Sequence, residues 1–176
     1  MLFRSQYFGE YADIRDDEAR HFRKIDYERY DTMAFLTVPY YAPETTYYVL
    51  ENMSPSRVGH LMMCYRRWPD INDQPYIAHS LRKLRDGDEL DREKTKAWVL
   101  NDLRLMESPS RKIVDERTWY YFPHIYTEDY SEGWYDDVEA MQGKYDTYYA
   151  GEIMSFGSMN ETAEYSRELV ERFFKY

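Results

Sequence analysis

The C-terminal segment, residues 145–176, constrains the fold more than any other part of the chain. Residues 147–150 are mostly aromatic or β-prone, and Gly151, which follows them, can adopt backbone conformations that other residues resist. The sequence therefore predicts a strand that ends abruptly at Gly151, with a loop after it.

A helix should follow that loop. Ser158 and Glu161 have the S-x-x-E spacing of a capping box, which places the first helical residue near Met159. Apolar and small residues then recur at three- and four-residue steps, and charged residues occupy the other side, so we expect one buried face. The expected buried positions are Thr162, Tyr165, Leu169 and Phe173, with Val170 and Phe174 beside them.

A strand, a glycine turn and a helix N-terminus together direct free backbone N–H groups at one place. Such a place suits an anion or a polarised carbonyl group. The alternative is that a capped terminal helix simply packs on a sheet, and from the pattern alone this is the commoner case, because caps occur on most helices.

The rest of the chain predicts an α+β fold with a mixed, largely antiparallel sheet and flanking helices. Several β-prone segments precede or separate a few amphipathic ones, and Asp88 is the expected cap of the longest internal helix. The expected strands are 27–38, 45–50, 60–68, 76–81 and 113–122, and the expected helices are 16–24, 88–106 and 136–141. The acidic and aromatic residues 126–135 are expected to form a loop.

Composition excludes several classes of function. A formal charge of −10 disfavours nucleic acids and anionic membranes as partners, and no apolar stretch is long enough to cross a bilayer. The four histidines have no metal-ligand spacing, so no metal site is expected. Cys64 is the single cysteine, and the N-terminal residues lack a signal-peptide pattern. We therefore expect a cytoplasmic protein.

Several stretches carry a resemblance to a known family. Near the C-terminus they are Tyr-Tyr-Ala-Gly-Glu at 148–152, Ser-Phe at 155–156 and Leu-Val-Glu-Arg-Phe-Phe at 169–174, and before them Trp-Tyr-Tyr-Phe-Pro-His at 119–124, Gly-Trp-Tyr at 133–135 and Gln-Gly at 142–143. They resemble the C-terminal part of flavin-dependent oxidoreductases of the amine oxidase superfamily, most closely the fungal branch described as β-cyclopiazonate dehydrogenase-like. In that family a strand, a Gly-Glu pair and a helix return the chain to the FAD domain and close over the flavin.

The resemblance implies roles for particular residues. It places Gly151 and Glu152 beside the ribityl–pyrophosphate part of FAD, and Ser158 with the backbone of Met159 against the flavin ring. The remaining implied contacts are Trp119 with the flavin and Tyr121 and Phe156 with the substrate. His124 is a candidate acid or base, since histidine titrates near neutrality, but no catalytic residue is assigned.

Two departures from the family limit what the resemblance implies. None of the seven glycines forms the G-x-G-x-x-G phosphate cradle. In addition, Ser158 stands where amine oxidases carry an aromatic residue, which argues against amine oxidation itself. Residues 1–144 are thus expected to form a substrate-binding region, and residues 145–176 to complete an FAD domain whose Rossmann part lies elsewhere.

The predicted function is the C-terminal portion of an FAD-dependent oxidoreductase that transfers hydride from a small organic substrate to flavin. Such a chain would not be competent alone and would need a missing or separate flavin domain as its partner. The alternative is a non-catalytic module, derived from the same scaffold, that binds a small molecule or a protein. If the first prediction holds, Gly151 and Met159 should border open space.

Overall fold

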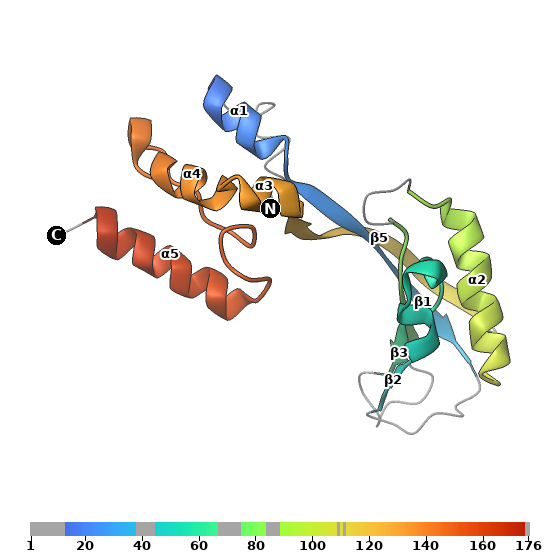
Figure 1. Cartoon of the computed structure of the whole chain (residues 1–176). Coiled ribbons are helices and arrows are strands. Elements are labelled where there is room, and N and C mark those ends of the chain that lie inside the picture. The colour runs from blue at the N-terminus through green and yellow to red at the C-terminus, as the bar shows by residue number, and fades with distance from the viewer. Residues whose placement is uncertain are drawn as a thin grey trace. The chain divides into compact units, whose positions relative to one another are not determined.

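The computed structural model describes residues 13–37, 45–66, 75–83, 89–108, 110 and 112–174 (Figure 1). The chain divides into two compact units, residues 1–27 with 122–176 and residues 28–121. We call these the first and the second unit and describe each by itself. The predicted boundary at residue 145 concerns membership of a flavin domain, and it stays a prediction.

The second unit holds most of a five-stranded sheet in the order β2-β3-β4-β1-β5. Its strands are β1 (Asp26–Leu36), β2 (Thr46–Tyr48), β3 (Met63–Tyr65), β4 (Tyr76–Leu81) and β5 (Lys112–His124). The pairs β1–β4, β3–β4 and β2–β3 are antiparallel. The predicted α+β fold with an antiparallel sheet and flanking helices is confirmed.

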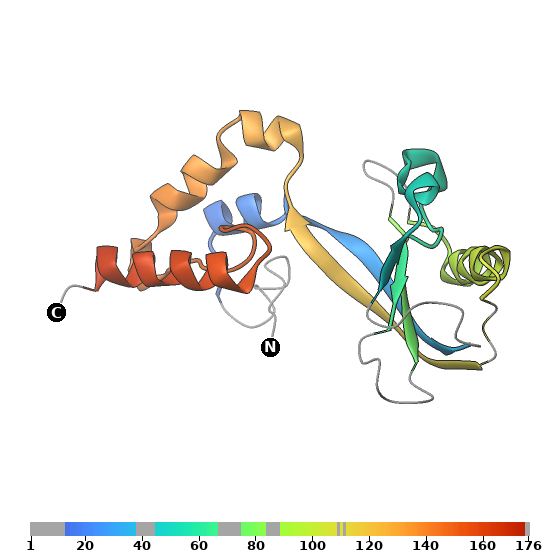
Figure 2. The same cartoon turned by 90° about the horizontal axis from the view of Figure 1, so that it is seen from below.

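Helix α2 (Arg92–Leu105) covers one face of this sheet (Figures 1 and 2). Met33 pairs with Ala78 across β1 and β4, and both side chains are buried in one cluster with Val99 and Leu103 of α2. The cap of α2 is Asp91, whose carboxylate accepts from the backbone N–H of Lys94 at 2.8 Å. The predicted cap, Asp88, lies outside the described residues.

The predicted strands 45–50 and 60–68 are shorter in the structure, where they are β2 and β3. After β2 the chain turns into the short 3-10 helices η2 (Leu50–Met53) and η3 (Pro55–Arg57). The reason is the buried carboxylate of Asp102 on α2, which accepts hydrogen bonds from Asn52 at 3.1 Å, His60 at 2.9 Å and the Leu61 backbone at 3.0 Å. Because a buried carboxylate needs such donors, residues 52–61 pack against α2 and do not extend the sheet.

The first unit is helical. Its elements are α1 (Asp16–Phe22), α3 (Thr127–Ser131), α4 (Trp134–Met141), η4 (Lys144–Asp146) and α5 (Met159–Phe173). Trp134 and Val138 on α4 are buried with Phe22 on α1, and the indole N–H of Trp134 donates to the backbone carbonyl of His21 at 3.0 Å. Helix α3 occupies part of a stretch that the sequence predicted as a loop.

The predicted strand over 147–150 is wrong, because the segment belongs to no strand in the structure. The buried side chain of Gln142 takes the place of a strand partner. Its Oε1 accepts from the backbone N–H of Tyr149 at 2.8 Å, and its Nε2 donates to the Tyr149 carbonyl at 2.7 Å. Both backbone polar groups of Tyr149 are therefore hydrogen-bonded without a neighbouring strand.

The predicted helix from Met159 is confirmed, but its predicted buried face is only partly right. The Ser158 hydroxyl accepts from the backbone N–H of Glu161 at 3.2 Å, and the Glu161 carboxylate accepts from that hydroxyl at 2.7 Å. Leu169 is buried, whereas Val170 is 50% exposed and Phe173 is 37% exposed. The apolar face of α5 is therefore mostly uncovered.

None of the described helices has the length and apolar character that a bilayer crossing requires.

Candidate functional site

A pocket of about 300 Å³ lies within the first unit. One wall is the end of β5 and the turn after it, and the other is the segment between Glu152 and Gly157 that leads into α5. Its volume is at the lower end of the range for small-molecule sites. The lining residues are Phe122, Pro123, His124, Ile125, Thr127, Tyr130, Tyr135, Glu152, Ser155, Phe156 and Gly157.

Two predicted contact residues, Glu152 and Phe156, meet in this pocket together with His124. The aromatic wall is formed by Phe122 and Phe156, whose rings meet edge to face with centroids 6.3 Å apart. Phe122 has a φ of +53°, a costly conformation for a bulky residue. Phe122 lies directly before Pro123 and His124, so the backbone of β5 bends where its end lines the pocket.

The imidazole of His124 is held in one tautomer. Its Nδ1 lies 2.8 Å from the backbone carbonyl of Phe122, and a carbonyl oxygen only accepts, so Nδ1 carries the proton. In the neutral ring Nε2 is then the acceptor. His124 has the arrangement that a proton acceptor needs, although its role stays a prediction.

Glu152 is half-buried, and burial raises the pKa of its carboxyl above the usual range. A Cβ placed on Gly157 would come within 2.9 Å of Glu152 Oε1, so the glycine lets this carboxylate lie close to the backbone before α5. The carboxyl group is thus held at the pocket wall by close packing.

Gly151 occupies a turn that only glycine adopts readily, with a φ of +140°. Its carbonyl accepts from the backbone N–H of Met154 at 3.0 Å and from the hydroxyl of Ser155 at 3.1 Å. Apart from Gly151 and its two chain neighbours, no described residue has an atom within 4 Å of the place where a Gly151 side chain would begin. The expected open space beside Gly151 is present.

The start of α5 is also open. Ser158 caps the helix, and the side chain of Met159 is 91% exposed. The N–H groups in the first turn of a helix have no intrahelical acceptor. Gly151, Ser158 and Met159 do not line the pocket, but each lies within two residues of a residue that does.

Trp119 and Tyr121 belong to the second unit, on β5. The indole N–H of Trp119 donates to the hydroxyl of Thr32 at 3.1 Å, and the ring of Tyr121 lies 5.2 Å from that of Tyr30. Their predicted contacts with flavin and substrate stay predictions. The sequence did not single out Tyr130 and Tyr135 of the pocket, because they fall in the stretch predicted as a loop.

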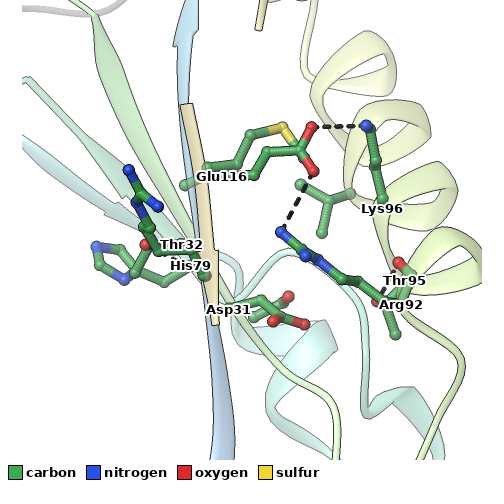
Figure 3. Close-up of a pocket in the computed structure, with 12 residues that line it drawn as sticks. Asp31, Thr32, His79, Arg92, Thr95, Lys96 and Glu116 are labelled. Carbon is green, nitrogen blue, oxygen red and sulfur yellow. Dashed lines mark hydrogen bonds and ion pairs between the residues drawn. The ribbon is translucent and has the colours of Figure 1, made fainter. Parts of the chain in front are cut away.

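A second cavity, in the second unit, is too small for a ligand. It has a volume of about 20 Å³, room for roughly one water molecule. Figure 3 shows Glu116 across it, paired with Lys96 Nζ at 2.6 Å and with Arg92 Nη2 at 3.7 Å. Among the described residues no cluster of histidine, cysteine and carboxylate side chains could hold a metal ion.

Comparison with known proteins gives one strong structural match. The crystal structure of a CLA-producing fatty acid isomerase from P. acnes superposes with a TM-score of 0.91 and 43% sequence identity, over 98% of this chain and 40% of that chain. The chain is similar to part of a fatty acid isomerase. It spans well under half of that protein's length.

No family model matches the chain, and no curated protein does. The structural match therefore gives no support to the fungal branch that the sequence resemblance named, and membership of the amine oxidase superfamily stays a prediction.

Proposed function

We propose that this chain is the C-terminal part of an FAD-dependent enzyme whose substrate is a fatty acid. The observation that carries the proposal is the match of nearly the whole chain, at 43% identity, to two fifths of a fatty acid isomerase. The reaction that fits is migration of a double bond, in which hydrogen leaves one carbon of the acyl chain and returns at another.

The residues around Gly151 fit the ribityl and ring part of FAD. An open space beside a glycine and an exposed helix start leave room for a planar group against the backbone. FAD, when bound, supplies a group that accepts a hydride and can give it back. The protein's part is to orient the substrate and to exclude water.

The pocket residues have distinct tasks in this proposal. Phe122 and Phe156 make an apolar wall that keeps water from the reacting carbons. His124 offers Nε2 as a proton acceptor, and Glu152 stands at the pocket wall with a raised pKa. We propose that these two groups would hold or accept a proton at the pocket wall when the cofactor is bound.

The adenine end of FAD needs residues that this sequence does not contain, since it has no G-x-G-x-x-G. We therefore propose that a flavin domain completes the site. The alternative, a non-catalytic binding module on the same scaffold, makes no use of flavin, so cofactor binding separates the two.

The test is complementation. The chain is co-expressed with the part of the P. acnes isomerase that it does not match, and the purified complex is examined for flavin absorbance and for isomerisation of linoleate. We expect a yellow complex that shifts a double bond. A stable complex without flavin would favour the binding module, and tight stoichiometric flavin on the chain alone would contradict the need for a second domain.

Two variants of α5 provide the matched control. Met159→Glu puts a carboxylate at the open helix start, and Ala163→Glu puts the same group on an exposed position one turn later. The first variant should lose most of the flavin from the complex. The second should keep it.

A further inference from the structure

The sheet face that points away from α2 carries a cluster of rings, which we call the aromatic face. Met33 and Ala78 point toward α2, so Thr32 and His79, one residue along each strand, point to the other side. Figure 3 shows His79 on that side of the sheet. The aromatic face consists of Tyr30, Tyr48, Tyr65, His79, Trp119 and Tyr121.

The rings are in contact with one another within the second unit. The ring centroid of His79 lies 5.1 Å from that of Tyr30 and 5.5 Å from that of Tyr65, which stacks on it with an interplanar angle of 9°. Tyr121 lies 5.2 Å from Tyr30. Trp119 is 54% exposed and Tyr121 is 46% exposed, so much of this apolar surface is uncovered.

His79 is the unusual member of the cluster. It is only 8% exposed, and neither ring nitrogen has a hydrogen-bond partner among the described residues. A neutral imidazole carries one donor and one acceptor, and leaving both unpaired in the interior is costly. Buried polar groups in native proteins are nearly always paired, so this ring calls for a polar partner that the described residues do not supply.

The tyrosine hydroxyl groups add further donors. Burial, together with the neighbouring phenols of Tyr121, Tyr65 and Tyr48, raises the pKa of Tyr30 to about 12. Tyr30 is therefore protonated at neutral pH, and its O–H can donate. The aromatic face combines exposed apolar rings with several neutral donors, which suits an amphipathic ligand that has an apolar chain and an acidic end.

We propose that the aromatic face binds the acyl chain of a fatty acid, with its carboxyl group hydrogen-bonded to His79 and to the tyrosine hydroxyls. This inference rests on the proposed function for the substrate class and says which residues orient the substrate. The nitrogens of His79 are closed to solvent in this state, so the carboxyl reaches them when the ring of Tyr30 or Tyr65 moves aside. A ring contact is then exchanged for a charge-assisted hydrogen bond, the stronger interaction.

The test uses two probes that share one chain, dodecanoate and 1-dodecanol, below their micellar or solubility limits. Their binding to residues 1–176 is measured by calorimetry. His79→Phe keeps a flat ring and removes both nitrogens, so it should weaken dodecanoate about tenfold and leave dodecanol unchanged. Tyr121→Ser should weaken both probes, because it removes part of the apolar wall.

The control variant is Tyr130→Phe, a tyrosine of the first unit that is 66% exposed and lies outside the aromatic face. It should bind both probes as the wild type does. If His79→Phe changes neither probe, or weakens both equally, the assignment of the carboxyl end is wrong while a fatty acid substrate still stands. If the wild type binds neither probe, the fatty acid substrate fails as well.

Discussion

His79, which is buried and has no hydrogen-bond partner in the described part of the chain, makes stability depend on pH. Burial lowers the pKa of His79 to about 4, below the value of about 6.5 that an unfolded chain has. Between these two values the unfolded chain binds more protons than the folded one. The free energy of unfolding is therefore unaffected by this group above pH 6.5 and falls as the pH drops toward 4.

We predict a loss of about 2 kcal/mol from His79 between pH 7 and pH 4.5. The measurement is urea unfolding of the wild type and of His79→Phe at both pH values. Carboxylates that titrate in the same range affect both proteins alike, so the difference between them isolates the imidazole. An equal loss in wild type and variant would mean that the ring is not held neutral.

The sequence predicted some of the residues that line the candidate site. The Trp-Tyr-Tyr-Phe-Pro-His motif, the Gly-Glu pair and the Ser-Phe pair led to His124, Glu152 and Phe156, and the structure brings these three to one pocket. The partners of Gln142 could not be predicted, because its amide pairs with backbone seven residues later, in a segment whose composition favours a strand. Tertiary hydrogen bonds decided the outcome against local preference.

The side chain of Gln142 connects the end of α4 to the segment before Gly151. Besides its two bonds to Tyr149, its Nε2 donates to the Tyr165 hydroxyl on α5 at 2.9 Å. Tyr165 in turn donates to the carboxylate of Glu139, which also pairs with Arg172 at 3.2 Å. One buried amide thus connects the end of α4, the segment before Gly151 and α5.

We predict that Gln142→Met, which has a similar size but no amide, opens this segment. The backbone N–H of Tyr149 loses its acceptor, so its hydrogen exchange should speed up by about tenfold or more. The amide of Glu161, which Ser158 caps, serves as an internal reference and should change little. Unchanged protection at Tyr149 would mean that other contacts hold the segment.

The sequence pattern predicted the position of α5 better than it predicted which of its side chains are buried. The capping spacing of Ser158 and Glu161 correctly located the start of α5, because a cap is a local interaction. The same pattern predicted a buried face, yet Val170 and Phe174 remain 50% and 46% exposed. An apolar stripe shows which side of a helix avoids water, but it does not show what covers that side.

Across the whole molecule, two observations support the proposal that a second domain packs on this chain: the exposed apolar residues near α5 and the limited span of the structural match. This chain aligns with 40% of a longer protein, and large apolar side chains such as Phe156 and Met159 are 70% and 91% exposed. Exposed apolar groups gathered on one element mark an interaction surface. The proposed flavin domain would cover them.

The last prediction compares exposed and buried apolar residues of the same segment. The double variant Phe156→Ser with Met159→Gln should bind less of a dye that reports on exposed apolar surface, with the free energy of unfolding changed by less than about 1 kcal/mol, because neither side chain is buried. Leu169→Ala, at a position only 4% exposed, should cost about 2–5 kcal/mol and raise dye binding. Since a surface that meets a partner must be open before assembly, the double variant should also fail to form the complex with the isomerase segment. Assembly that survives the double variant would place the contact elsewhere on the chain.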